Sequence, residues 1–236
     1  MAVAIQAHRG STDAGTGTSE NTLAAFARAA ALGADGVELD VRLTADGALA
    51  VVHDPEVPGR GPVAGLVVAD LPADVPLLAE ALAVCGDLTV NIEIKNLPTK
   101  PGHDPNDAVA DAVAALVVEL GMDDQVVISS FWPPSLTAVR RAAPQLATGL
   151  LVAPFTGAAA GLSLAGELGV SAIHPHHSLV DPEVVTAAHG AGLAVATWTV
   201  DDAETMGAVA DAGVDTVITD DVPLAVGVLS GRAGNG

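Results

Sequence analysis

The chain has 236 residues, 50% of them hydrophobic, which is long enough for one large α/β domain with a substantial core. The chain contains no run of about eighteen uncharged apolar residues, so no membrane span is predicted. The 29 Asp and Glu against 9 Lys and Arg give a formal net charge of −20, which argues against nucleic acid or an anionic membrane as a partner, because both need basic patches.

Two features of the chain bear on its location. The first ten residues, MAVAIQAHRG, have no basic region before their apolar stretch and do not resemble a secretory signal. Cys85 is the single cysteine and cannot form an internal disulfide, which fits a reducing compartment. We therefore expect a cytoplasmic protein.

Apolar runs rich in β-formers alternate with alanine-rich helical stretches along the chain. Strands are predicted over residues 3–8, 36–41, 49–53, 88–95, 125–131, 147–152, 170–175, 193–198 and 215–219. Helices are predicted over residues 20–32, 76–84, 105–120, 133–143, 157–168, 181–190, 201–211 and 221–229. The expected helix caps are Asp104, Asp181 and Asp201, because each begins a helical stretch with a carboxylate that can accept free backbone N–H groups.

This alternation implies a parallel sheet with right-handed crossovers. If residues 49–53 form the return arm of a hairpin, eight strands each precede a helix, which predicts a single-domain (β/α)8 TIM barrel over residues 1–231. Residues 54–76 are then a short insertion loop, and residues 232–236 a disordered tail. The alternative is an open doubly wound sheet, although no strand is followed by a glycine-rich phosphate fingerprint.

Charged residues interrupt two of the apolar strands. Glu38 and Asp40 in VELDVRL share one strand face, and Glu93 and Lys95 in NIEIK share another. Buried charge is costly unless it is paired or bound to metal. Each carboxylate alone could be a structural partner of Arg42, Arg9 or Lys95. Three carboxylates on neighbouring strands instead favour a hard divalent cation, Mg²⁺ or Ca²⁺.

Further polar residues stand at strand ends, where TIM barrels carry their functional groups. The first strand ends in His8 and Arg9, and the hairpin arm ends in His53 and Asp54. Arg9, together with Lys95, suits a phosphate, and the two histidines suit acid–base transfer near neutral pH. A divalent cation, two basic residues that hold a phosphate and two histidines that transfer protons together indicate phosphodiester cleavage.

The scarce aromatic residues and a histidine cluster allow two interpretations. Phe131 and Trp198 either pack in the core or form an apolar wall against the substrate. His174, His176 and His177 suggest zinc, but no fourth ligand is evident, and we expect them to line the mouth or face water. A substrate contact by His174 or His176 stays open.

An ordered set of motifs runs through nearly the whole chain. They are AHRG (7–10), ENTLAAFARAAALGADGVELDVRLTADGALAVVHD (20–54), VPLLAEAL (75–82), NIEIK (91–95), SSF (129–131), LVDPEVVTAAHGAGLAVATWTVDD (179–202) and GVDTVITD (213–220). The set resembles the glycerophosphodiester phosphodiesterase family. One departure is Ser19, which stands where the family usually has the Pro before Glu-Asn-Thr.

The resemblance implies a barrel that hydrolyses glycerophosphodiesters to glycerol 3-phosphate and an alcohol with the help of one divalent cation. It implies that three carboxylates are the metal ligands, two histidines the acid–base pair and two basic residues the phosphate clamp. The residues are, in that order, Glu38, Asp40 and Glu93; His8 and His53; Arg9 and Lys95. Glu20 and Asn21 are either plain helix-cap residues or, as the resemblance implies, supports of the site.

Two other functions stay open at this point. One is a lysophospholipase D-like activity on larger lipids, and the other is a phosphodiester-binding barrel without activity. The sequence also leaves open the alcohol, the choice of Mg²⁺ or Ca²⁺, the oligomeric state and which histidine is the acid. It does not distinguish direct attack by water from a cyclic phosphate intermediate.

Overall fold

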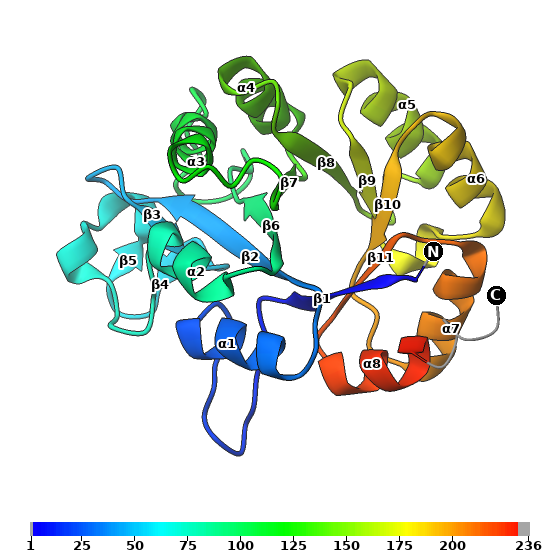
Figure 1. Ribbon diagram of the computed structural model, residues 1–236. Helices are drawn as coiled ribbons and strands as arrows, with labels where there is room; N and C mark the ends of the chain where they lie inside the picture. Colours follow the sequence, from blue (N-terminus) through cyan, green and yellow to red (C-terminus); the bar gives the residue numbers. More distant parts are fainter. Residues whose placement is uncertain (1, 231–236) are drawn as a thin grey trace.

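The computed structural model describes residues 2–230, and eight parallel strands in this range close into a barrel (Figure 1). Closure is visible at β1, which pairs with β2 on one side and with β11 on the other. The barrel strands are β1 (Ala4–His8), β2 (Gly36–Leu43), β6 (Thr89–Ile94), β7 (Val126–Ser130), β8 (Ala147–Val152), β9 (Ala172–Pro175), β10 (Ala194–Thr197) and β11 (Thr216–Thr219). The predicted TIM barrel is confirmed, and the open sheet is wrong. Residues 232–236 lie outside the described range.

Helices surround the barrel in the order that the alternation predicted. They are α1 (Leu23–Ala31), α2 (Leu78–Cys85), α3 (Ala108–Glu119), α4 (Pro133–Ala142), α5 (Ala158–Leu168), α6 (Pro182–Gly190), α7 (Ala203–Ala212) and α8 (Val222–Ser230). Of the three expected caps, Asp181 is confirmed, since its carboxylate accepts the N–H of Val184.

The other two caps are wrong, and each has a physical reason. Asp202 caps α7, because Asp201 uses its carboxylate on Thr219 and on the backbone of Asp220. Asp104 accepts N–H groups in a turn before α3, which begins only at Ala108.

Successive side chains of β2 point alternately toward the surrounding helices and into the barrel. Val37, Leu39 and Val41 of β2 are fully buried in the hydrophobic layer between barrel and helices. Glu38 and Asp40 alternate with them and therefore face the barrel interior. The fold thus forces the charged residues of β2 inward and its apolar residues outward.

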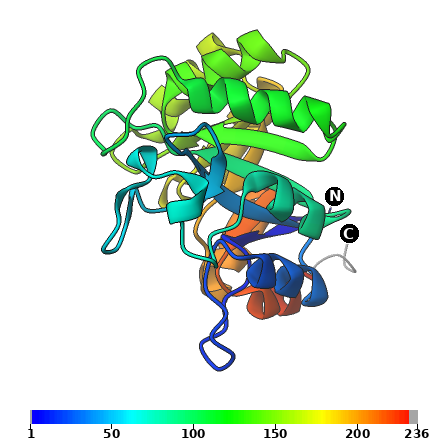
Figure 2. The same ribbon diagram turned by 90° about the vertical axis from the view of Figure 1, so that its left-hand side faces the viewer.

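The connection from β2 to α2 lies outside the closed barrel. β3 (Leu49–Val51) pairs antiparallel with β2, and it is shorter than the predicted strand over residues 49–53. The expected loop that follows contains a small hairpin, β4 (Glu56–Val57) and β5 (Gly61–Pro62), and two 3-10 turns, η1 (Val63–Gly65) and η2 (Val68–Asp70). Ala50, Val57, Val63 and Leu66 give this insertion its own small hydrophobic cluster. Figure 2 shows it on the side opposite the start of β1.

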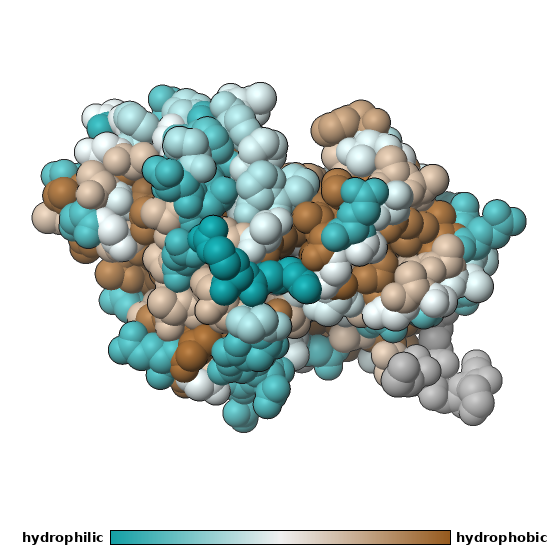
Figure 3. Space-filling model, turned by 90° about the horizontal axis from the view of Figure 1, so that it is seen from above, coloured by the Kyte–Doolittle hydropathy of each residue, from teal (hydrophilic) through white to brown (hydrophobic). Residues whose placement is uncertain are grey.

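The outer surface is uneven in polarity. In Figure 3 hydrophilic groups gather over α3 and α4, and apolar groups gather over α5. Within residues 2–230, none of the helices combines the length and the apolar character needed to cross a membrane.

Gly149 offers a test of the packing inside the barrel. A Cβ at this inward position of β8 would lie 2.5 Å from Nε2 of the buried His174 ring. We expect Gly149→Ala to lower the free energy of unfolding by about 1–3 kcal/mol, because the buried ring would have to shift to make room for the Cβ. The control is Gly166→Ala on α5, where a Cβ meets open space and should stabilise by about 0.5–1 kcal/mol. Urea unfolding of the two variants measures both changes, and equal stabilities would contradict the packing described.

Candidate active site

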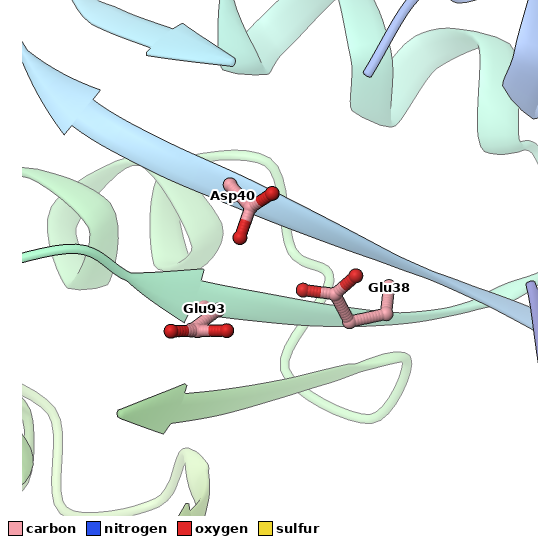
Figure 4. Close-up of side chains that lie close together, drawn as sticks. All are labelled: Glu38, Asp40 and Glu93. Carbon is pink, nitrogen blue, oxygen red and sulfur yellow. The ribbon is translucent and has the colours of Figure 1, made fainter. Parts of the chain in front are cut away.

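Three buried carboxylates meet at the mouth of the barrel. Glu38 and Asp40 come from β2 and Glu93 comes from β6, where Asp40 and Glu93 are register partners (Figure 4). Each offers an oxygen within 4.8 Å of the others, and none of the three residues is more than 7% exposed. The spacing that suggested a shared site in the sequence therefore corresponds to one compact cluster.

Two cations lie against this cluster. The Lys95 ammonium is 2.6 Å from Glu93 Oε1 and 3.0 Å from Asp40 Oδ1, and Arg9 Nε is 3.3 Å from Asp40 Oδ2. Burial lowers the pKa of Lys95, but Glu93 and Asp40 outweigh it and raise that pKa. Burial raises the pKa of Asp40, yet Lys95 and Arg9 outweigh it, so this pKa is lowered and Asp40 is ionised.

Glu38 is the carboxylate that these cations leave unbalanced. Its Oε2 accepts the backbone N–H of Arg9, whereas its buried Oε1 has no hydrogen-bond partner among the described residues. Burial, followed by the charge of Asp40, raises the pKa of Glu38 to about 8. An orphaned oxygen in a buried, oxygen-only donor set is what a hard divalent cation needs, so these residues fit the expected metal.

Two residues with strained backbone conformations contact this cluster. Arg9 and Asn21 both adopt left-handed conformations, with φ of 55° each, which non-glycine residues rarely adopt. In this arrangement the Asn21 amide donates to Asp40 Oδ2 at 2.8 Å and accepts the Asp40 N–H at 3.2 Å. Glu20 in turn accepts from the Arg9 guanidinium at 3.0 Å. Thr22 is the cap of α1, so capping does not explain Glu20 or Asn21.

His8, at the end of β1, has a partner that sequence reasoning missed. Its Nδ1 lies 2.7 Å from Oδ1 of Asp220, the residue that follows β11. Because a carboxylate can only accept, Nδ1 carries the proton and leaves Nε2 for chemistry. Burial lowers the pKa of His8, but Asp220 and Glu38 outweigh it and raise that pKa. The predicted barrel could have revealed this contact, because closure brings the end of the last strand beside the end of the first.

His53 lies beyond the end of β3, on the appended arm. Its Nδ1 lies 2.9 Å from Asp54 Oδ1, which leaves Nε2 free in the same way. Burial lowers the pKa of His53, the charge of Asp40 opposes this, and the net pKa is lowered. The pKa values of His8 and His53 are thus shifted in opposite directions.

Arg42 connects the arm to the barrel. Its Nε and Nη2 donate to the His53 carbonyl at 3.0 and 2.7 Å, and its Nη1 donates to the Lys95 carbonyl at 3.1 Å. Sequence reasoning considered Arg42 as a structural partner of carboxylates. The structure shows a different contact, which fixes two proposed functional residues relative to each other.

A cavity of about 170 Å³ joins these groups. His8, Arg9, Glu38, His53, Glu93 and Lys95 line it, together with Phe131 and Trp198. The two aromatic rings meet edge to face with centroids 5.4 Å apart. The Trp198 indole donates to the His174 carbonyl at 2.7 Å, so its exposed part is an apolar wall. Asp40 lies behind the cavity lining, and Glu20 and Asn21 line a neighbouring pocket with His53.

The expectation for His174 is wrong. It is 3% exposed, does not line the cavity, and burial lowers its pKa to about 4. The reason is Gly149, whose missing side chain leaves room for the ring inside the barrel. His176 packs against Trp198, with ring centroids 5.1 Å apart, and so supports the apolar wall from outside.

Comparison with known proteins gives consistent results. Residues 8–224 match the model of the glycerophosphoryl diester phosphodiesterase family. A glycerophosphodiester phosphodiesterase of Caldanaerobacter subterraneus subsp. tengcongensis is 35% identical over 242 residues, which cover 94% of this chain and 95% of the relative. A putative glycerophosphoryl diester phosphodiesterase from Silicibacter pomeroyi aligns with a TM-score of 0.86 at 27% identity and covers 98% of this chain and 94% of that one. An Oleispira antarctica phosphodiesterase in complex with the product sn-glycerol-3-phosphate shares the fold, with a TM-score of 0.79 at 24% identity over 98% and 97% of the two chains.

The raised pKa of Glu38 predicts that cation binding releases a proton. Without a cation a carboxyl group with a pKa of about 8 is mostly protonated at pH 7, and a bound divalent cation displaces that proton. Titration calorimetry with Mg²⁺ or Ca²⁺ in buffers of different ionisation enthalpy should show roughly one proton released at about pH 7 and far less at about pH 9.5. Glu38→Gln should weaken binding and remove most of the release. An equal release at both pH values would contradict the assignment.

Proposed function

The chain belongs to the glycerophosphoryl diester phosphodiesterase family and is a phosphoric diester hydrolase that forms glycerol 3-phosphate and an alcohol, and we propose that the cavity at the barrel mouth performs this hydrolysis. One observation carries the proposal. Two imidazoles, each with its Nδ1 against a carboxylate, share a single cavity with Glu38, Glu93 and two basic side chains. Binding alone needs no acid–base pair, so this set argues against the non-catalytic alternative.

Hydrolysis adds the oxygen of water to phosphorus and breaks the bond between phosphorus and the oxygen of the alcohol. One proton must leave the attacking oxygen, and one must reach the departing alkoxide. We assign removal to His53, whose lowered pKa keeps its Nε2 unprotonated at neutral pH. We assign donation to His8, whose raised pKa, held up by Asp220 and Glu38 against burial, favours its protonated form.

The charged groups have separate parts in this proposal. Glu38, Asp40 and Glu93 would hold one Mg²⁺ or Ca²⁺ ion, which supplies positive charge to the phosphate oxygens. Arg9 and Lys95 add fixed positive charge beside the cluster, in a protein whose overall charge of −20 repels an anion. Glu20 and Asn21 keep Arg9 and Asp40 in place, and Phe131 with Trp198 forms the apolar wall.

Two broader points belong to the same proposal. We propose a cytoplasmic location, which is supported by the unpaired, buried Cys85, whose pKa burial raises to about 12. The partner is a small glycerophosphodiester, and the product named for the Oleispira protein, sn-glycerol-3-phosphate, is the product we assign here. The −20 charge argues against nucleic acid as a further partner.

The first test is release of glycerol 3-phosphate from glycerophosphocholine and glycerophosphoethanolamine. We expect turnover that stops with EDTA, returns with Mg²⁺ or Ca²⁺, and falls by at least about 100-fold in Glu93→Ala, because the cluster loses a ligand. The surface variant Glu167→Ala on α5 should behave as wild type. Turnover indifferent to EDTA would overturn the metal cluster. Turnover on lysophosphatidylcholine alone would favour the lysophospholipase D-like function. Formation of a cyclic phosphate product in a single turnover would exclude direct attack by water.

The second test separates the two histidines. Asp220→Asn removes the carboxylate that raises the pKa of His8, so that pKa falls. If His8 donates the proton, the alkaline limb of the kcat profile should move down by about one pH unit. Asp54→Asn is the matched control, because Asp54 raises the pKa of His53, and its loss should move the acidic limb instead. A shift of the acidic limb in Asp220→Asn would reverse the two roles.

A further inference from the structure

Arg42 lies beside the proposed site without pairing with any of its carboxylates. It shares the inward face of β2 with Glu38 and Asp40, and it is 9% exposed. Burial lowers its pKa, and the negative charges of Asp40 and Glu93 oppose that shift. Even so, no ion pair within residues 2–230 includes Arg42. Its hydrogen-bond donors are used elsewhere.

The guanidinium binds two backbone carbonyls that lie just beyond strand ends. Nε and Nη2 donate at 3.0 and 2.7 Å to the carbonyl of His53, two residues after β3 ends at Val51. Nη1 donates at 3.1 Å to the carbonyl of Lys95, one residue after β6 ends at Ile94. A carbonyl past the end of a strand has left the ladder and needs another donor. One side chain of β2 therefore ties the arm to the end of β6.

This contact locates His53 in a way that its other contacts do not. The partner of the His53 ring is Asp54, which lies on the same arm, so that bond turns the ring without fixing its distance from the barrel. The strand before it has only three residues, and Val52 makes a further backbone bond to the Asp40 carbonyl at 2.9 Å. The first side-chain bond from the barrel to His53 itself is the one from Arg42.

The chemistry of the tie is specific to arginine. A guanidinium carries its donors in one rigid plane, so it can hold two oxygens of separate segments at a fixed distance from each other. An ammonium group is a point charge on a flexible chain, and beside Asp40 and Glu93 it would pair with a carboxylate instead. A neutral side chain of similar length would leave both carbonyls without this donor.

We propose that Arg42 is a positioning residue that sets the place of the His53 imidazole relative to the Lys95 ammonium. This inference rests on the proposed function and adds to it the group on which the proton-transfer geometry depends. The proton acceptor stays at one distance from a phosphate held at Lys95. Arg42 itself does not line the cavity, so it acts only through the two residues whose carbonyls it binds.

Steady-state kinetics on glycerophosphocholine with Mg²⁺ tests this role. Arg42→Met should lower kcat by about 10–100-fold and change KM by less than about threefold, because His53 is misplaced while Lys95 keeps its carboxylate contacts. Arg42→Lys should lose nearly as much. Added guanidinium should restore part of the kcat of Arg42→Ala, and methylammonium at equal ionic strength should not. The control is Arg141→Met on the surface of α4, which should keep the wild-type kcat.

An NMR titration of the histidine rings makes the comparison without turnover. Burial lowers the pKa of His53 in the wild type. In Arg42→Met we expect this pKa to rise toward its ordinary value, because a ring that is no longer held against the barrel gains water. The pKa of His8 should not move, since its partner Asp220 follows a barrel strand. A general loss of structure would move both.

Three results would overturn the inference. An unchanged kcat in Arg42→Met would mean that His53 is held without Arg42. A raised KM with an unchanged kcat would mean that Arg42 only attracts the anion. A lower kcat without guanidinium rescue and without a separate shift of His53 would mean that Arg42 only supports the fold.

The titration also separates this inference from the proposed function. If the wild type does not turn over, the proposed function fails, and a shift of His53 alone in Arg42→Met would still support the tie. No shift in that case would refute it. Arg42→Lys, the smaller change, serves for both measurements if Arg42→Met does not fold.

Discussion

The structure depends on keeping three carboxylates together in a place that water hardly reaches. Like charges repel, and burial strengthens that repulsion, so the basic neighbours of the cluster have to compensate for it. Lys95 bridges Asp40 and Glu93, Arg9 lies along Asp40, and the Arg9 N–H is bonded to Glu38. Compensation is incomplete, since Glu38 still holds a proton in the absence of a cation. A divalent cation that displaces this proton would supply the missing positive charge, which is the physical basis of the proposed cation site.

Strained backbone and charge compensation are two aspects of one arrangement. The left-handed Arg9 aims its own N–H at Glu38 while its side chain runs along Asp40. The left-handed Asn21 bonds both the side chain and the backbone of Asp40, and its N–H donates to the Arg9 carbonyl at 2.8 Å. Strain of this kind persists only where surrounding contacts determine the conformation, and here the contacts are with Glu38 and Asp40 of the proposed metal site.

The sequence predicted the parts of this arrangement that follow from periodicity. Alternation in β2 and β6 placed Glu38, Asp40 and Glu93 on inward faces, and the count of strand–helix units predicted the barrel. Contacts between distant segments could not be predicted in that way. Asp220 reaches His8 only through barrel closure, and Arg42 reaches two carbonyls that no side-chain pattern reveals. His174 was misjudged because the space that buries it comes from Gly149, a residue on another strand.

The placement of His53 has a consequence for heat resistance. His8 belongs to a closed ring of strands, whereas His53 follows a three-residue strand at the edge of that ring, beside an insertion with its own small cluster. Such a segment can open locally while the barrel remains folded. Because the proposed base lies on this arm, we expect activity to be lost on warming before the barrel itself melts. Lineages of this enzyme could adapt to hotter habitats by reinforcing the arm alone, without altering the barrel core.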